Sequence, residues 1–221
     1  MHLYHENMLG GFAIVGGHVP VATGAAFAAH YLNQKNKFSL CFLGDGAVAQ
    51  GSVHESLNLA SLWDLPCIYV IENNHWGMGT AVSRAICAQP IAEKLAPAYN
   101  MSSYTLDGMD YFQSYGCFQA IYKEMQEKGR PILVEAVTER FKGHSISDPG
   151  LYRSKEELQH AMERDPILLL KNALIRNKIL TEDEYKQFDK EKRELVIASM
   201  EFAEQSPDPD PLTLEEGVME L

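Results

Sequence analysis

Two uninterrupted apolar runs, each as long as one strand, most constrain the fold of this 221-residue chain. They are FSLCFLG at residues 38–44 and CIYVIENN at residues 67–74, and the segment between them, SVHESLNLASLWDL (52–65), has helical spacing. Continuous apolar strands are typical of parallel sheets that are covered on both faces. One helix between two such strands makes a right-handed crossover between neighbouring parallel strands. We therefore expect an α/β fold with helices on both faces of the sheet, in which the first strand is buried on both faces.

The same alternation of helix and strand continues along the chain. We expect helices over 19–32 and 110–127, strands over 103–108 and 131–138, and an irregular Gly-rich loop over 74–80. Beyond residue 153 the pattern becomes helical, and two capping-box sequences indicate helix starts at Ser154 and Thr181. A further helix is predicted from Pro166 to about residue 180, and the Pro- and Asp-rich tail is expected to be extended. The predicted domains are 1–153, an α/β domain, and 154–221, a helical region with an acidic tail.

Charge and composition exclude several functions. The formal net charge of −11 argues against nucleic acid and anionic membrane surfaces as partners. No apolar stretch is long enough to span a bilayer, and the N-terminal residues lack the basic and apolar regions of a signal peptide. None of the four cysteines lies in a C-x-x-C pair, which is typical of reduced thiols in a cytosolic protein.

Polar residues follow both strands of the first crossover. Asp45 lies between Gly44 and Gly46 after the first strand, and Asn73 and Asn74 close the second, with 26 residues (47–72) between Gly46 and Asn73. The carboxyl ends of parallel strands meet at one edge of a sheet, so we expect Asp45 and Asn74 to converge there. An all-oxygen set of this kind suits Mg²⁺, and the glycines let phosphates approach the backbone.

Simpler roles are open for the same residues. Asp45 could cap the helix that follows it, and the two asparagines could be turn formers. A cap explains the acid but not the matched asparagine pair, so we favour a metal site.

The motif GDG-x26-NN resembles the pattern of thiamine diphosphate enzymes. Three segments resemble the α subunits of pyruvate dehydrogenase E1 components in order and spacing, over nearly the whole chain: IVGGHVPVATGAAFA, GDGAVAQGSVHESLNLASLWDLPCIYVIENNHWGMGT and GHSISDPGLYRSKEE. The resemblance implies the thiamine-diphosphate-binding fold for residues 1–153. It also implies that the N-terminal portion of the family's α subunit is absent from this chain.

The resemblance assigns a metal and diphosphate site. It implies that Asp45 and the side-chain amide of Asn74 bind Mg²⁺ together with the main-chain carbonyl of Trp76. The backbone amides of Gly46 and Ala47 would bind the diphosphate of thiamine diphosphate, near Gly44.

Other residues are assigned by the same resemblance to the organic part of the cofactor. Ala13 and Val15 match the positions that meet the aminopyrimidine, where Val15 would bend the cofactor. His144 matches a catalytic and cofactor-binding position in a mobile loop that Tyr152 and Arg153 end. An exposed loop histidine is the simpler interpretation of His144, but the Gly-rich surroundings are typical of a lid.

The implied activity is that of an oxidoreductase: decarboxylation of pyruvate, followed by transfer of the acetyl group to a lipoyl group on an E2 protein. The family's β chain supplies the glutamate that activates the cofactor, so this chain alone is expected to be inactive and to work in a heterotetramer. A bacterial-type cytoplasmic location is expected, with an organellar matrix or stroma as the alternative.

Three alternatives remain at this point. The substrate could be that of an acetoin or branched-chain 2-oxo acid dehydrogenase. The chain could be a non-catalytic fragment that only docks to β. A nucleotide-binding domain built on GGHVPVATG is disfavoured, because no strand precedes those glycines.

Overall fold

The computed structural model of the chain describes residues 7–215. Contacts divide the chain into two compact units, Met1–Leu169 and Leu170–Leu221. The first unit is built on a parallel sheet, and the second is helical. The functional division predicted after residue 153 stays a prediction.

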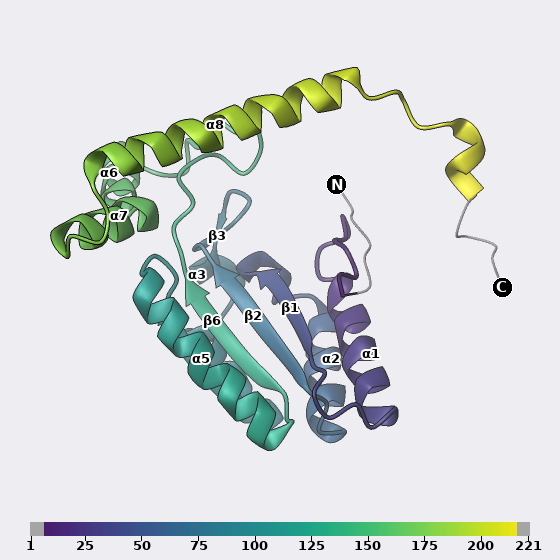
Figure 1. Cartoon of the computed structure of the whole chain (residues 1–221). Coiled ribbons are helices and arrows are strands. Elements are labelled where there is room, and N and C mark those ends of the chain that lie inside the picture. Colours follow the sequence, from purple (N-terminus) through teal and green to yellow (C-terminus); the bar gives the residue numbers. More distant parts are fainter. Residues whose placement is uncertain (1–6, 216–221) are drawn as a thin grey trace. The chain divides into compact units, whose positions relative to one another are not determined.

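The central sheet has four strands in the order β1-β2-β6-β5, and every neighbouring pair is parallel. Figure 1 shows three of them, β1, β2 and β6, side by side with their arrowheads at the same end. The strands of the sheet are β1 (Ser39–Gly44), β2 (Cys67–Asn73), β5 (Ser102–Asp107) and β6 (Ile132–Val137). Each lies within one residue of a predicted strand boundary, because glycine, proline and polar residues mark both ends of each apolar run in the sequence.

Helices cover both faces of the sheet, as predicted. Alternate side chains of β1 and β2, among them Leu43 and Tyr69, pack with α1 (His18–Tyr31) and α2 (Gly51–Leu62). The opposite face of β2 and β6 packs on α5 (Tyr111–Lys128). Three short helical segments, α3 (Val82–Ala85), α4 (Ile91–Leu95) and η2 (Ala96–Tyr99), contribute to the first of these two cores. The fold is therefore an α/β fold with two apolar cores separated by the sheet.

Strand β1 differs from its prediction. Cys41 and Leu43 are buried, but Leu40 and Phe42 on the other face are 46% and 49% exposed. The apolar core beneath α5 draws its sheet residues from β2, β5 and β6, and β1 lies at the end of the sheet. The prediction of burial on both faces was therefore wrong, since an apolar run does not show whether a helix reaches both sides of a strand.

Segment 74–80 was predicted to be an irregular loop, which was also wrong. It contains a small antiparallel hairpin of β3 (Trp76–Gly77) and β4 (Thr80–Ala81). His75 and Met78 have left-handed backbone conformations, with φ of 68° and 56°. Two-residue strands leave little periodicity for a sequence pattern to reveal.

The helices beyond the sheet are α6 (Lys155–Glu163), α7 (Pro166–Arg176) and α8 (Glu182–Gln205). Both predicted capping boxes are present, at Ser154 and at Thr181. The prediction for α7 was too long, because the helix ends before Lys178, whose φ is 57°. The tail was predicted to be extended, but Pro211–Glu215 forms a 3-10 turn, and residues 216–221 lie outside the described part.

All four cysteines are free thiols, and Cys41 and Cys67 are buried in the core. Burial raises the pKa of the Cys67 thiol to about 12. Within residues 7–215, no helix combines the length and the hydropathy that crossing a membrane requires.

Candidate functional site

The carboxyl ends of β1 and β2 place the predicted site residues at one edge of the sheet. Gly44 pairs with Glu72 in the parallel register, so Asp45 and Asn73 occupy the next step of the two strands. Figure 1 shows β1 and β2 side by side, with both arrowheads at this edge. The structure therefore brings together the two segments in which the metal ligands were predicted.

Asp45 is a buried acid with an unused oxygen. The residue is 2% exposed and begins the 3-10 segment η1 (Asp45–Ala47). Among the described residues, no partner donates a hydrogen bond to its Oδ2 atom. Burial raises the pKa of Asp45, and this effect is opposed by backbone hydrogen bonding and by the nearby side chains of His75 and Arg140. A buried carboxylate oxygen is costly unless a positive charge or a donor satisfies it.

The alternative role of Asp45, capping the following helix, finds no support in the geometry. Helix α2 begins at Gly51, and the residue in its N-cap position is Gln50. Asp45 lies five residues further back, within its own 3-10 turn.

Two glycines allow the Asp45 turn to contact the β3–β4 hairpin. A Cβ atom added at Gly46 would lie 3.1 Å from the Cα of Gly77, and one added at Gly77 would lie 3.2 Å from the Cα of Gly46. Such a close main-chain approach leaves no room for side chains. It holds Trp76, which precedes Gly77, next to the Asp45 turn.

Asn73 and Asn74 both shape the turn after β2, as the turn-former interpretation predicts. Asn73 Oδ1 accepts a hydrogen bond from the His75 amide at 3.0 Å, and Asn74 Oδ1 accepts one from the Trp76 amide at 3.1 Å. Asn74 is half-buried, whereas Asn73 is 5% exposed. A carboxamide oxygen has two lone pairs, so the turn bond leaves Asn74 Oδ1 one further position for a ligand.

The Trp76 carbonyl is also partly engaged. The Arg140 guanidinium donates to it at 3.3 Å and to the Met78 carbonyl at 2.7 Å. The first of these bonds is long, and a carbonyl oxygen can accept twice. Arg140, which lies just beyond β6, therefore binds two main-chain carbonyls of the hairpin. The Trp76 carbonyl oxygen can still accept one further bond.

The loop predicted to be a lid, residues 141–153, is tied to this hairpin. Tyr152 accepts a hydrogen bond from Arg140 at 2.5 Å, donates one to Asp148 at 2.6 Å, and its ring lies 4.9 Å from that of Trp76. The Tyr152 hydroxyl, the His144 amide and the Gly150 amide all donate to Asp148 and lower its pKa to about 2.

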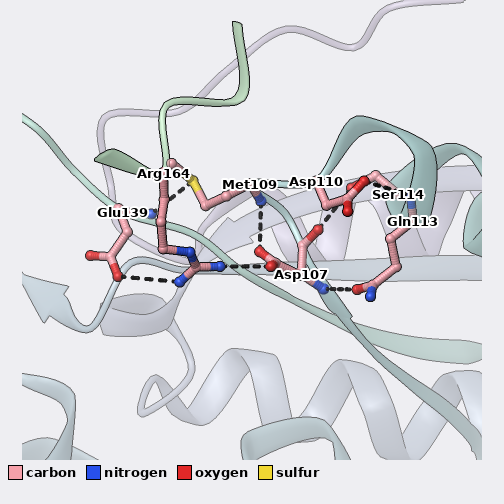
Figure 2. A network of polar contacts seen from close by, with 7 residues as sticks. All are labelled: Asp107, Met109, Asp110, Gln113, Ser114, Glu139 and Arg164. Carbon is pink, nitrogen blue, oxygen red and sulfur yellow. Dashed lines mark hydrogen bonds and ion pairs between the residues drawn. The ribbon is translucent and has the colours of Figure 1, made fainter. Parts of the chain in front are cut away.

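Beyond this loop, helix α6 is followed by Arg164, which joins the C-terminal end of that helix to the sheet (Figure 2). Its guanidinium lies 2.6 Å from Asp107 at the end of β5 and 4.0 Å from Glu139, two residues beyond β6. Arg153 also donates to the Arg140 and Lys142 carbonyls, so the two ends of the loop are joined.

The remaining predicted residues are more exposed. The His144 side chain is exposed, and only its main-chain amide makes a described hydrogen bond, to Asp148. Val15 is 57% exposed, and Ala13 is exposed too. Gly16 (φ 78°) packs so closely on Gln50 that an added Cβ would lie 3.1 Å from its Cγ. The 13–17 segment therefore lies beside the start of α2, near the Asp45 turn.

The sequence analysis assigned no role to two polar residues near this edge, Glu135 and Arg140. Glu135 is a carboxylate inside the apolar strand PILVEAVT, and a charge in a buried strand requires a partner, so a signal was present. Arg140 lies outside any periodic segment, and nothing in its neighbourhood indicated its role.

No group of three His, Cys, Asp or Glu side chains within residues 7–215 could hold a metal ion together. A cation at this edge would therefore rely on amide and main-chain oxygens besides the Asp45 carboxylate. Mg²⁺ accepts such ligands and keeps positions for phosphate oxygens and water.

Comparison with known proteins decides the family. Residues 1–212 match the model of the dehydrogenase E1 component family. The chain belongs to this family.

The dehydrogenase E1 component relatives include three whose names describe the alpha subunit of a pyruvate dehydrogenase E1 component. The protein from Rickettsia felis is 41% identical over 212 residues, which are 95% of this chain and 64% of the relative. The protein from Rhizobium meliloti is 42% identical over 213 residues, which are 95% of this chain and 61% of the relative. The alpha-3 protein of Oryza sativa subsp. japonica, described as chloroplastic, is 41% identical over 232 residues, which are 99% of this chain and 53% of the relative. This dehydrogenase E1 component chain thus spans about three fifths of the length of the curated relatives it matches.

Proposed function

We propose that this chain binds thiamine diphosphate through Mg²⁺ and serves as the α chain of a pyruvate dehydrogenase E1 component. The observation that carries the proposal is the unpartnered Oδ2 atom of buried Asp45, at the sheet edge where the Asn74 turn also lies. A bound cation would satisfy this oxygen, and the donor set fits Mg²⁺.

The residues fit the cofactor in the following way. Asp45, Asn74 Oδ1 and the Trp76 carbonyl would hold the cation, and the amides of Gly46 and Ala47 would meet the diphosphate next to Gly44. When bound, thiamine diphosphate supplies the nucleophile and the electron sink for decarboxylating a 2-oxo acid. Val15 and Ala13 would contact the aminopyrimidine from the segment beside α2.

The lid residues would close the site. Arg140 and Tyr152 hold the loop against the Trp76 hairpin, which would exclude water from the reacting atoms. His144, at the exposed part of the loop, would exchange a proton with the substrate-derived group once the loop closes over it.

The proposal for the partners is supported by the relatives, each of which is named as an alpha subunit. We propose that a β chain completes the active site and that an E2 protein presents the lipoyl group that receives the acetyl group. The chain by itself would therefore be inactive, with the bacterial cytoplasm as its expected location.

The test is a calorimetric titration of MgCl₂ into the chain with thiamine diphosphate, with and without the β chain of a relative. We expect Asp45→Asn to lower the affinity for Mg²⁺ by at least about tenfold. It should leave the metal-free chain as stable as before or more stable, because an unpaired buried charge is removed. Glu72→Gln is the control, since it removes an exposed acid from the same edge.

Three outcomes would count against the proposal. Equal Mg²⁺ binding by wild type and Asp45→Asn would remove Asp45 from the site. Binding of β without any heat from Mg²⁺ and cofactor would favour a docking chain with no cofactor. Turnover of acetoin or a branched-chain 2-oxo acid in preference to pyruvate would contradict the assignment of pyruvate as the substrate.

A further inference from the structure

We propose that Glu135 is a positioning residue that sets the shape of the cation site through Asn73. The inference rests on the proposed function, and it concerns a residue that need not touch cation or cofactor. Glu135 lies on β6, the strand beside β2, and Ile71 is its register partner.

Glu135 is a buried carboxylate with both oxygens occupied. It is 2% exposed, Oε1 accepts a hydrogen bond from Asn73 Nδ2 at 2.7 Å, and Oε2 accepts one from the Ala92 amide at 2.9 Å. Charge-assisted bonds of this kind are stronger than neutral ones, especially away from water. One carboxylate thus connects β6 to the end of β2 and to the start of α4.

The bond from Asn73 fixes which way its amide points. Because Nδ2 donates to Glu135, Oδ1 must face the other way, where it accepts from the His75 amide. The Asn73 carbonyl accepts in addition from the Thr138 amide at 2.8 Å. The side-chain amide of Asn73 is therefore used at both ends to hold the turn.

The turn needs this support. His75 and Met78 both have left-handed backbones, a conformation that costs a residue other than glycine about 1–2 kcal/mol. Asn74 and Trp76, two of the three proposed ligands, flank His75. A turn that relaxed would move the Asn74 amide and the Trp76 carbonyl together, and Mg²⁺ tolerates little departure from octahedral geometry.

The substitution Glu135→Gln separates this role from simple packing. Glutamine has the same shape but only one acceptor, so if its oxygen keeps Ala92, its NH₂ group faces the NH₂ group of Asn73. Asn73 can avoid this by flipping its amide, but its NH₂ group then faces the His75 amide. The unfavourable contact between two donor groups then lies in the turn that carries the proposed ligands.

The double variant Asn73→Asp with Glu135→Gln restores all three bonds, with the donor reversed only in the bond between positions 73 and 135. The introduced glutamine would donate to one oxygen of the introduced aspartate and accept from Ala92, and the second aspartate oxygen would accept from His75. One buried negative charge is kept. The control is Glu124→Gln, which alters another carboxylate with both oxygens bonded, to Ser102 and Tyr104 at 2.5 Å each.

The experiment measures two quantities on the full chain with its β partner. The first is the Kd of Mg²⁺ at saturating thiamine diphosphate. The second is amide hydrogen exchange of residues 73–78 in the metal-free protein. We expect Glu135→Gln to raise the Kd of Mg²⁺ by about tenfold and to speed exchange in the turn. The double variant should return both quantities to within about threefold of wild type, as expected for a restored pair, and Glu124→Gln should change neither.

The outcomes separate the two proposals. If wild type binds no Mg²⁺, the proposed function fails, while the exchange measurement still tests whether Glu135 holds the turn. If wild type binds Mg²⁺ and Glu135→Gln binds it equally well, or if the double variant fails to recover, the positioning role is overturned. A lower melting temperature with an unchanged Kd would assign Glu135 to stability alone.

Discussion

Gly46 and Gly77 touch at the point where the Asp45 turn meets the hairpin, so neither position has space for a side chain. An alanine at position 46 would place its Cβ 3.1 Å from a main-chain atom, which cannot rotate away. We expect Gly46→Ala to lower the free energy of unfolding by about 1–3 kcal/mol, the range for overpacked sites. Urea denaturation measures this change. Gly44→Ala is the control for stability, because no atom lies within 4 Å of the added Cβ and φ is −75°, and equal effects of both variants would contradict the prediction.

We expect Asp148 to make the order of the 141–153 loop depend on pH. Its pKa is lowered to about 2 by the bonds it accepts from Tyr152, His144 and Gly150, whereas an unfolded aspartate titrates near about 3.9. A group with a depressed pKa stabilises the folded loop fully above about pH 4, and this contribution is lost as the pH falls towards about 2.

The Trp76 ring, 4.9 Å from Tyr152, reports on this change by fluorescence. In a Trp63→Phe background, we expect the signal to be constant above about pH 4 and to change as the pH falls below it. Asp148→Asn should show the altered signal already at neutral pH. If the two proteins have the same pH profile, Asp148 does not hold the lid.

As an element, the segment made of the 141–153 loop and α6 is joined to the sheet at its C-terminal end by Arg164 (Figure 2). Its pair with Asp107 is short but partly exposed, so its loss should change the free energy of unfolding by less than about 1 kcal/mol. We expect Arg164→Gln instead to speed hydrogen exchange locally, in residues 141–163. Arg193→Gln is a matched control, since Arg193 pairs with Asp189 at the similar distance of 2.7 Å within α8, and an equal response to both variants would argue against an anchor.

Much of the fold could be predicted from the sequence, because local patterns of apolar, capping and turn residues indicate strands β1 and β2, helix α5 and the caps of α6 and α8. Besides the length of α7 and the 3-10 turn in the tail, two predictions were wrong: the burial of the outer face of β1, and the irregular loop at 74–80, where the β3–β4 hairpin lies. Both depend on contacts between distant segments: the reach of α5 over the sheet, and the approach of Gly46 to Gly77.

The residues of the candidate site also fall into two groups, those that the sequence predicted and those that it did not. Asp45 and Asn74 were found because each follows a strand directly, so topology alone brings them to one edge. Glu135 and Arg140 were not found. The charge of Glu135 inside an apolar strand was a signal that it has a partner, but no spacing in the chain reveals the hydrogen bonds of these two residues to Asn73, Trp76 and Met78.

Within the described residues of the first compact unit, the outer apolar face of β1 is partly exposed. Leu40 and Phe42 on β1 are about half exposed at the end of the sheet. Exposed apolar surface of this kind favours association. We expect the double variant Leu40→Thr with Phe42→Thr to reduce concentration-dependent self-association of the isolated chain in sedimentation velocity, with little loss of stability. Leu43→Thr, on the buried face, should instead destabilise the fold by about 2 kcal/mol or more, and unchanged association of the double variant would contradict the role of the outer face.

The unpartnered Oδ2 atom of Asp45 has a consequence for how long the protein persists in a cell. A buried charge is expensive only while nothing neutralises it, so a divalent ion bound there would stabilise the native state according to its free concentration and its affinity. Turnover by proteases follows the population of opened molecules. The supply of magnesium and vitamin-derived cofactor would then govern how much of this protein persists, as well as how fast it works.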